Sequence, residues 1–184
     1  MKTKNLSFWV FPLIFFLFIP GCSPEQPEKY RTSPWPQFRH DRAHSGQASV
    51  PGLEAGNVYW SYTTGGGITS SPAISGDNRV AIGSSDNNLY CFTTDGKLLW
   101  IYNTGGEVRS SPAFDEMGRV YCGSNSGYIF CLSPGGKLVW SYLAGGHIRS
   151  SPVLARNGTV YIGSNNGKIY SIDRGGRLLW SYKT

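Results

Sequence analysis

The side chains that could carry out metal or redox chemistry are few in this chain of 184 residues. His40 and His44 are four apart, a spacing at which two imidazoles on a helix can face one metal ion, but no third ligand lies near them in the sequence. Acidic residues are scattered singly, whereas Ca²⁺ prefers about six to eight oxygen ligands. We therefore predict no metal site and no catalytic residue.

The four cysteines are too few for the disulfide framework of a small secreted domain. A disulfide between Cys122 and Cys131 is conceivable if their strands pair. A register that places Val120 opposite Cys131 leaves Cys122 diagonal to it, which is poor geometry for a bond. We therefore favour buried thiols over a disulfide.

Cys22 follows a segment that is typical of a secretory signal. Lys2 and Lys4 precede the apolar stretch 8–19, whose twelve residues fall short of the roughly 20 that span a bilayer. The residues Ile-Pro-Gly-Cys at 19–22 resemble the bacterial lipoprotein signal, which implies cleavage before Cys22 and lipidation of that cysteine. An ordinary secreted protein with a chance cysteine is the alternative.

Lipidation implies a membrane anchor, because each buried CH₂ contributes about 0.8 kcal/mol. Ser23 follows the cysteine, and for a Gram-negative source the resemblance implies an outer-membrane lipoprotein of the cell envelope that faces the periplasm. We divide the N-terminal part into a signal peptide at 1–21, a lipidated, proline-rich tether at 22–36, and a lead-in segment at 37–56.

A step of forty residues organises the remaining chain. Trp60, Trp100, Trp140 and Trp180 follow this step without insertion, and a Ser-Ser-Pro triplet recurs with it three times. Such self-similarity indicates a repeat architecture. Each period holds four short β-type runs separated by loop-forming residues, and no window shows a helical period.

The expected strands are apolar on both faces, as at 89–92 and 129–132, so each sheet must be covered on two sides. Four-stranded antiparallel sheets stacked around an axis meet this requirement, and we predict an all-β fold, a β-propeller. The four repeated tryptophans are predicted to fill the wedges between blades, with ligand stacking as the alternative. The repeats at 57–184 divide into an outer strand at 57–62 and blades at about 65–102, 105–142 and 145–182.

About three blades are too few to close a ring, because known propellers have about four to eight. The outer strand at 57–62 matches the fourth strand of a repeat, and three whole repeats follow it. We therefore expect an incomplete ring from a truncated gene product. Self-association of such arcs through their unpaired end blades is the alternative.

Residues 150–180 and their two predecessors resemble the PQQ-like repeat of quinoprotein-type β-propellers, a family with BamB-like bacterial lipoprotein members. The lead-in sequence Trp-Pro-Gln-Phe-Arg-His-Asp at 35–41 resembles the segment before the first blade of many members. In the quinone dehydrogenases of this family, PQQ lies beside Ca²⁺ and an adjacent cysteine pair. This chain has no such pair and no acidic cluster, so we predict no PQQ and no other cofactor.

The formal charge of +6 comes from basic residues spread along the chain without a basic run, so we predict no nucleic-acid partner. A protein partner is expected at positions that differ while the framework repeats. Glu107 and His147 are equivalent, and so are Arg109 and Arg149. The two arginines could present donors to an acidic or carbonyl-rich partner, with solvated loop-end charges as the alternative.

These features predict a non-catalytic, lipid-anchored β-propeller that serves as a binding or scaffold protein of the bacterial cell envelope. The BamB-like resemblance implies a role in outer-membrane protein assembly. A fragment of a PQQ-dependent quinoprotein oxidoreductase is the alternative.

Overall fold

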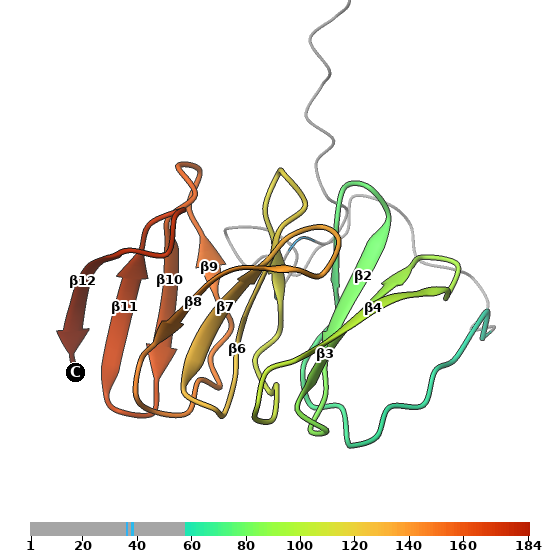
Figure 1. Ribbon diagram of the computed structural model, residues 1–184, viewed down its shortest axis with the longest axis horizontal. Coiled ribbons are helices and arrows are strands. Elements are labelled where there is room, and N and C mark those ends of the chain that lie inside the picture. Colours follow the sequence, from blue (N-terminus) through green and yellow to red (C-terminus); the bar gives the residue numbers. More distant parts are fainter. Residues whose placement is uncertain (1–35, 37, 39–57) are drawn as a thin grey trace, which may run out of the picture.

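The computed structural model describes Pro36, Phe38 and residues 58–184. All regular elements of this part are β-strands, which form three four-stranded antiparallel sheets side by side (Figure 1). The predicted all-β fold with four-stranded propeller blades is thus confirmed. None of the described residues belongs to a helix that could span a membrane. Cys22, His40 and His44 lie outside the described residues.

In each blade the four strands follow one another in sequence order, each paired with the next. The first blade consists of β1 (Ala73–Ile74), β2 (Arg79–Gly83), β3 (Asn88–Thr93) and β4 (Leu98–Asn103). The second consists of β5 (Ala113–Phe114), β6 (Val120–Gly123), β7 (Tyr128–Leu132) and β8 (Leu138–Leu143). The third consists of β9 (Val153–Leu154), β10 (Val160–Ser164), β11 (Lys168–Ile172) and β12 (Leu178–Lys183).

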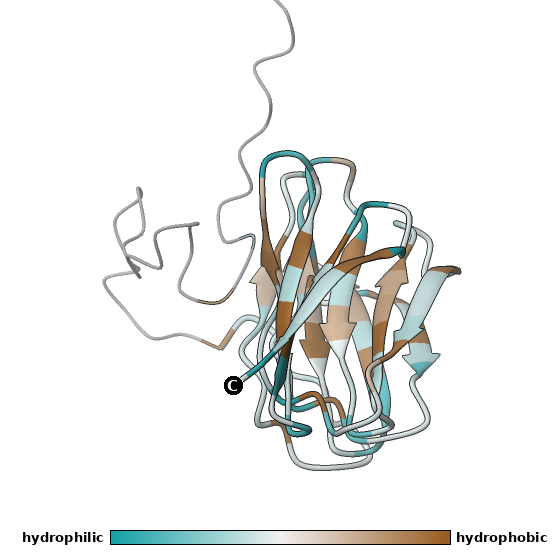
Figure 2. Cartoon of the chain, turned by 90° about the vertical axis from the view of Figure 1, so that its left-hand side faces the viewer, coloured by the Kyte–Doolittle hydropathy of each residue, from teal (hydrophilic) through white to brown (hydrophobic). Residues whose placement is uncertain are grey.

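Apolar cores lie between the blades, because β3, β7 and β11 are apolar on both faces. In β7, Ile129 and Cys131 belong to the core shared with the third blade, whereas Phe130 and Leu132 belong to the core shared with the first. Apolar and polar segments alternate along the strands in Figure 2. Each blade therefore hides one face against each neighbour, which is the requirement that a stack of blades meets.

Residues 58–62 form no strand, in contrast to our expectation of an outer strand at 57–62; Asn57 itself lies outside the described residues. Their repeat equivalents are β4, β8 and β12, which pair with the third strand of their own blade. The described residues offer no such partner to 58–62. The segment instead packs its side chains on the first blade, where Trp60 and Tyr62 lie 5.6 and 4.9 Å from Phe92 between ring centroids.

Candidate functional site

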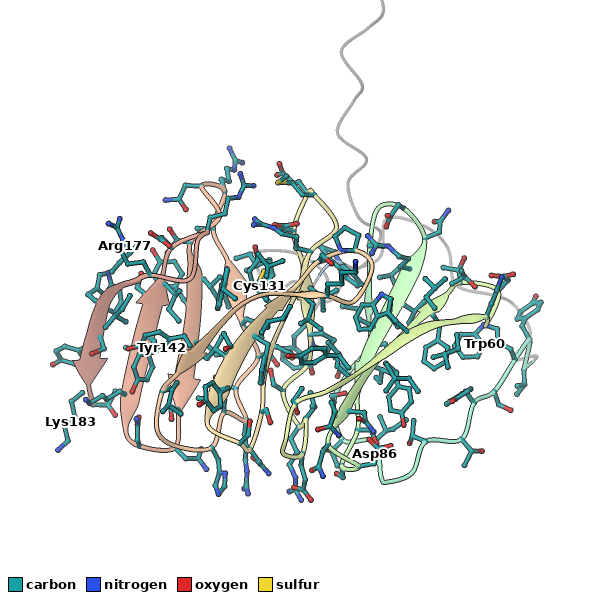
Figure 3. The ribbon with its side chains drawn as sticks, in the orientation of Figure 1. Trp60, Asp86, Cys131, Tyr142, Arg177 and Lys183 are labelled. Atoms are coloured by element: carbon teal, nitrogen blue, oxygen red, sulfur yellow. The ribbon has the colours of Figure 1, made fainter. Side chains whose placement is uncertain are left out.

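Three of the repeated tryptophans make the same contact at successive blade positions. Each indole N–H donates to a carbonyl oxygen in the turn between the third and fourth strands of the next blade along the chain. The pairs are Trp60 with Thr94, Trp100 with Pro134, and Trp140 with Arg174, each at 3.0 Å. Figure 3 shows Trp60 pointing from its segment toward the first blade.

Each of these indole rings also covers a glycine of the same turn. Gly96, Gly136 and Gly176 have positive φ angles of 90°, 78° and 89°. A Cβ atom at these glycines would come within 2.5, 2.6 and 2.7 Å of the ring, so only glycine allows the close approach. Trp140, which lies between the second and third blades, is 9% exposed, whereas Trp180, which contacts no further blade among the described residues, is 46% exposed.

The Ser-Ser-Pro triplets also join neighbouring blades. The backbone N–H of Ser71 donates to Ser111 Oγ at 2.8 Å, and the N–H of Ser111 donates to Ser151 Oγ at 3.2 Å. The first serine acts within its blade, since Ser70 Oγ accepts from the N–H of Gly83 at 2.9 Å. Sequence reasoning used the triplet only to mark the repeat. The unchanged recurrence of the triplet every forty residues was the sequence signal that its hydroxyl groups have a structural role.

The four residues proposed for partner contact come together around a fifth, Asn125. The amide of Asn125 and Nε of Arg109 each donate to Glu107 Oε2 at 2.8 Å. His147 Nδ1 contacts the backbone carbonyl oxygen of Asn125, and Arg149 Nε lies 3.4 Å from its side-chain oxygen. We call these five residues the polar cluster.

Backbone hydrogen bonds and buried anchors position the polar cluster. Asn125 lies in the turn between β6 and β7, and its N–H donates to the carbonyl oxygen of Glu107 at 2.8 Å. Val108 and Ile148 are fully buried, so the side chains on either side of them point outward. The arginines and His147 are exposed, while Glu107 and Asn125 are half-buried. One carboxylate against two guanidinium groups leaves the cluster with excess positive charge.

Asn125 was missed because its neighbours are distant in sequence. Its repeat equivalents are Ser85 and Asn165, so this turn position is polar but variable. In all three blades the backbone N–H of this residue donates to the backbone carbonyl oxygen of a residue that lies shortly before the first strand of the same blade. The acceptors are Gly67, Glu107 and His147 in the first, second and third blades. The signal that could have identified Asn125 is a turn position whose side chain varies between repeats while its backbone hydrogen bond stays the same.

The described cysteines are buried free thiols. The register pairs Tyr121 with Cys131 and Cys122 with Phe130, one residue away from the register we considered. This places Cys122 and Cys131 in different apolar cores on opposite faces of the sheet, where no disulfide can join them. Burial raises the pKa of Cys91 and of Cys122 to about 12 and that of Cys131 to about 11.

The described residues do not fit a quinone centre built on Ca²⁺. Among them no three His, Cys, Asp or Glu side chains lie close enough together to hold a metal ion. The carboxylate of Glu107 is already engaged by Arg109 and Asn125, and the thiols are buried.

Comparison with protein families matches residues 46–184 to the PQQ-repeat family described as outer membrane protein assembly factor BamB. The chain belongs to this family. The resemblance found from the sequence is therefore confirmed, and the forty-residue step is the spacing of its PQQ-like repeats. A comparison with curated proteins finds no match.

Solved structures of the same fold include BamB and quinohemoprotein alcohol dehydrogenases. BamB from Moraxella catarrhalis is 25% identical with a TM-score of 0.58, over 67% of this chain and 40% of that one. The quinohemoprotein alcohol dehydrogenase ADHIIG from Pseudomonas putida HK5 is 17% identical with a TM-score of 0.73, over 84% of this chain and 27% of that one. The quinohemoprotein alcohol dehydrogenase from Comamonas testosteroni is 22% identical with a TM-score of 0.69, over 84% of this chain and 28% of that one.

The present chain thus matches well under half of the length of each of these proteins. At 17% and 22% identity, the likeness to the dehydrogenases shows the fold alone.

Proposed function

We propose that this PQQ-repeat protein is a non-catalytic, lipid-anchored β-propeller that binds protein partners at the bacterial cell envelope and takes part in outer-membrane protein assembly. The observation that carries the proposal is the match of residues 46–184 to a family described as an outer-membrane protein assembly factor. The blades then serve as a rigid frame, and binding takes place at positions that vary from blade to blade.

The polar cluster is the partner contact in this proposal. Its two arginines come from adjacent blades, and hydrogen bonds to Glu107 and Asn125 hold them in place before any partner arrives. Side chains ordered in advance lose less conformational entropy on binding. The excess positive charge selects an acidic or carbonyl-rich protein surface, because guanidinium groups form strong charge-assisted hydrogen bonds with such acceptors.

Lipidation at Cys22 supplies the membrane contact in this proposal. The proline-rich tether at 22–36 then leads from an outer-membrane anchor to the propeller on the periplasmic side. A protein held at the membrane meets membrane-bound partners at a high effective concentration, so a modest contact at the polar cluster is sufficient.

The test is the retention of partners by the full chain expressed in its own envelope. We expect Arg109→Ala with Arg149→Ala to abolish co-purification of outer-membrane assembly proteins while the melting temperature stays unchanged. The control is Lys137→Ala with Arg156→Ala, which removes the same charge from exposed turns at the opposite end of the blades. Equal retention by both double variants would reject the polar cluster as the contact.

A separate measurement addresses catalysis. The full chain is dialysed against PQQ and Ca²⁺, and the bound quinone is measured by its absorbance. We expect no stoichiometric binding, because the described side chains provide no oxygen-rich cluster. Stoichiometric binding together with alcohol-dependent dye reduction would replace the scaffold proposal with a quinoprotein oxidoreductase.

A further inference from the structure

The imidazole of His147 is held in the polar cluster by one of its two ring nitrogens. Its Nδ1 contacts the backbone carbonyl oxygen of Asn125. A carbonyl oxygen only accepts hydrogen bonds, so this contact assigns the proton of the neutral ring to Nδ1. The other nitrogen, Nε2, then carries a lone pair and has no hydrogen-bond partner among the described residues. Because the side chain is exposed, Nε2 is open to a ligand.

The two arginines of the polar cluster also keep free donors. Nε of Arg109 donates to Glu107 Oε2 at 2.8 Å, and Nε of Arg149 lies 3.4 Å from Asn125 Oδ1. These contacts engage only Nε, and no residue of the described part of the chain accepts from the terminal nitrogens of either guanidinium. A guanidinium presents its N–H groups as a rigid fork, so two terminal nitrogens together can hold both oxygens of a carboxylate.

The elements packed around His147 contribute few charges. The turn at 164–167 contacts it through the N–H of Asn165, which donates to the carbonyl oxygen of His147 at 2.9 Å. Neither this turn nor the turn at 124–127 contains a titratable side chain. The charged side chains of the polar cluster come from the segments before β5 and β9, and they are Glu107, Arg109 and Arg149. One carboxylate and two guanidinium groups give this set a charge of +1 when the imidazole is neutral and +2 when it is protonated.

This charge and the internal contacts fit a carboxylate better than a phosphate group. A single carboxylate balances a charge of +1, whereas a phosphate monoester carries about −1.5 to −2 at pH 7. Glu107 shows that a carboxylate fits the donors of the polar cluster, since its Oε2 accepts from both Arg109 and Asn125. The acidic side chains of a protein, Asp and Glu, are the ligands of this chemistry.

We propose that the polar cluster binds an Asp or Glu side chain of its partner through the terminal nitrogens of Arg109 and Arg149 and through Nε2 of His147, and that protonation of His147 strengthens this binding. A neutral Nε2 turns its lone pair toward the carboxylate oxygen and repels it. The protonated ring instead donates a hydrogen bond and adds a positive charge. Binding therefore tightens as the pH falls through the range of about 5 to 8 in which histidine ordinarily titrates. This inference rests on the proposed function, because it names the group that the polar cluster takes from its partner.

The test is a titration of the full chain in a mild detergent with a short blocked peptide, Ser-Glu-Ser, followed by NMR chemical shifts. We expect the dissociation constant to be at least threefold lower at about pH 5.5 than at about pH 7.5, a range in which the peptide carboxyl stays mostly ionised. The matched peptide Ser-Gln-Ser should not bind. In His147→Gln the ratio between the two pH values should fall to about one, and an unchanged ratio in this variant would overturn the proposal.

Two control variants accompany this titration. His44→Gln removes another of the three histidines and should keep the full pH dependence. Arg109→Ala with Arg149→Ala should raise the dissociation constant at least tenfold at both pH values. Peptide binding that survives in the arginine double variant would reject the assigned donors.

The protonation of the imidazole is tested without a ligand. In protein labelled with ¹⁵N only at histidine, the signals of His147 are identified by their loss in His147→Gln. We expect a proton on Nδ1 and none on Nε2 at about pH 8, where histidine is ordinarily neutral. A neutral ring with its proton on Nε2 would contradict the contact with Asn125 and overturn the proposal.

The same titration separates a carboxylate ligand from a phosphate ligand. Inorganic phosphate and vesicles of phosphatidylglycerol replace the peptide, and we expect both to perturb the signals of His147 less than Ser-Glu-Ser does. Stronger binding of either phosphate probe would assign the polar cluster to a phosphate-bearing ligand and reject the present proposal.

Failure of this inference is distinguishable from failure of the proposed function. Peptide binding that does not depend on pH, together with loss of co-purification in the arginine double variant, would overturn the inference alone. Retained co-purification in that variant, together with pH-dependent peptide binding by the wild type, would overturn only the proposed partner contact.

Discussion

The indole N–H of Trp100 donates a 3.0 Å hydrogen bond to the carbonyl oxygen of Pro134, and the same ring covers Gly136 two residues further on. One side chain thus fixes both the position and the shape of a turn in the next blade. Trp140 and Arg174 repeat the relationship one blade later. The blades are therefore joined by side chains at a fixed distance along the sequence.

Loss of such a ring should be costly only where a next blade is present. We expect Trp140→Ala to lower the free energy of unfolding by about 3–5 kcal/mol, the usual range for a buried aromatic residue. Trp180→Ala should cost less than about 1 kcal/mol in the monomer, because Trp180 is 46% exposed. Urea denaturation of monomeric protein measures both, and equal losses would contradict the assigned role of the ring.

Three glycines separate the effect of backbone conformation from that of crowding. Gly135 has neither a positive φ nor a close neighbour, Gly145 has a φ of 82° but open space, and Gly136 has a φ of 78° and the ring of Trp100. We expect alanine to cost nearly nothing at Gly135, about 1 kcal/mol at Gly145, and clearly more at Gly136. Thermal and urea unfolding rank the three variants. A Gly136→Ala variant as stable as Gly145→Ala would show that the ring does not constrain the turn.

The buried thiols predict a loss of stability at alkaline pH. Burial raises the pKa of Cys122 from its ordinary value to about 12, so the folded state disfavours the thiolate. A raised pKa stabilises the fold fully below the ordinary thiol value of about 8.5 and progressively less as the pH rises toward 12. We expect the free energy of unfolding to fall over this range, and less so in Cys122→Ala. The described thiols should also resist maleimide until the chain is denatured.

We expect the side chain of Arg79 to couple the first two blades strongly. Its guanidinium pairs with Asp77 at 2.8 Å and donates to the carbonyl oxygens of Pro134 at 2.7 Å and Gly118 at 3.1 Å. We expect Arg79→Ala to lower the free energy of unfolding by about 2–3 kcal/mol, since it removes a charged donor from the carbonyl oxygen of the buried Gly118 and from that of Pro134.

The control for that variant is Arg177→Ala, which removes an arginine whose side chain is 81% exposed and pairs with Asp173 within one turn. Exposed ion pairs contribute about 0–1 kcal/mol, so this variant should remain close to the wild type. Chemical unfolding compares the two. Similar losses in both would mean that the carbonyl contacts of Arg79 add no stability.

Lipidation is checked directly by metabolic labelling. We expect radiolabelled palmitate to appear in the full chain and to disappear in Cys22→Ser, because that side chain is the predicted site of attachment. A variant with the free buried thiol of Cys91 replaced by alanine should keep the label. Label retained by Cys22→Ser would exclude the proposed anchor.

The blade positions were predictable because the tryptophans and turn residues repeat without insertion, and local turn chemistry sets where each strand begins. The register in which the strands pair was not predictable from the sequence. Cys131 lies opposite Tyr121 rather than Val120, and a strand that is apolar on both faces gives no pattern from which to choose between the two. The strand expected at 57–62 failed for a related reason, since its sequence resembles β12 but strand formation depends on a partner.

The polar cluster was predictable only in part. Equivalent repeat positions singled out Glu107, Arg109, His147 and Arg149 as candidates for partner contact, because variation within a constant framework is visible in one sequence. The contacts among them depend on Asn125, which reaches them across two blades through the turn between β6 and β7. Contacts of this kind arise from packing between blades, which no local pattern records.

The serine bonds between blades all run in one direction, from each N–H to the hydroxyl forty residues later. The serine and tryptophan hydrogen bonds are consequently the same at both junctions between the described blades. In-frame duplication or deletion of one complete forty-residue unit would leave the surviving junctions chemically intact, whereas a change of any other length would misalign them. Recombination between its own repeats can therefore change the blade number of such a gene without the evolution of a new interface.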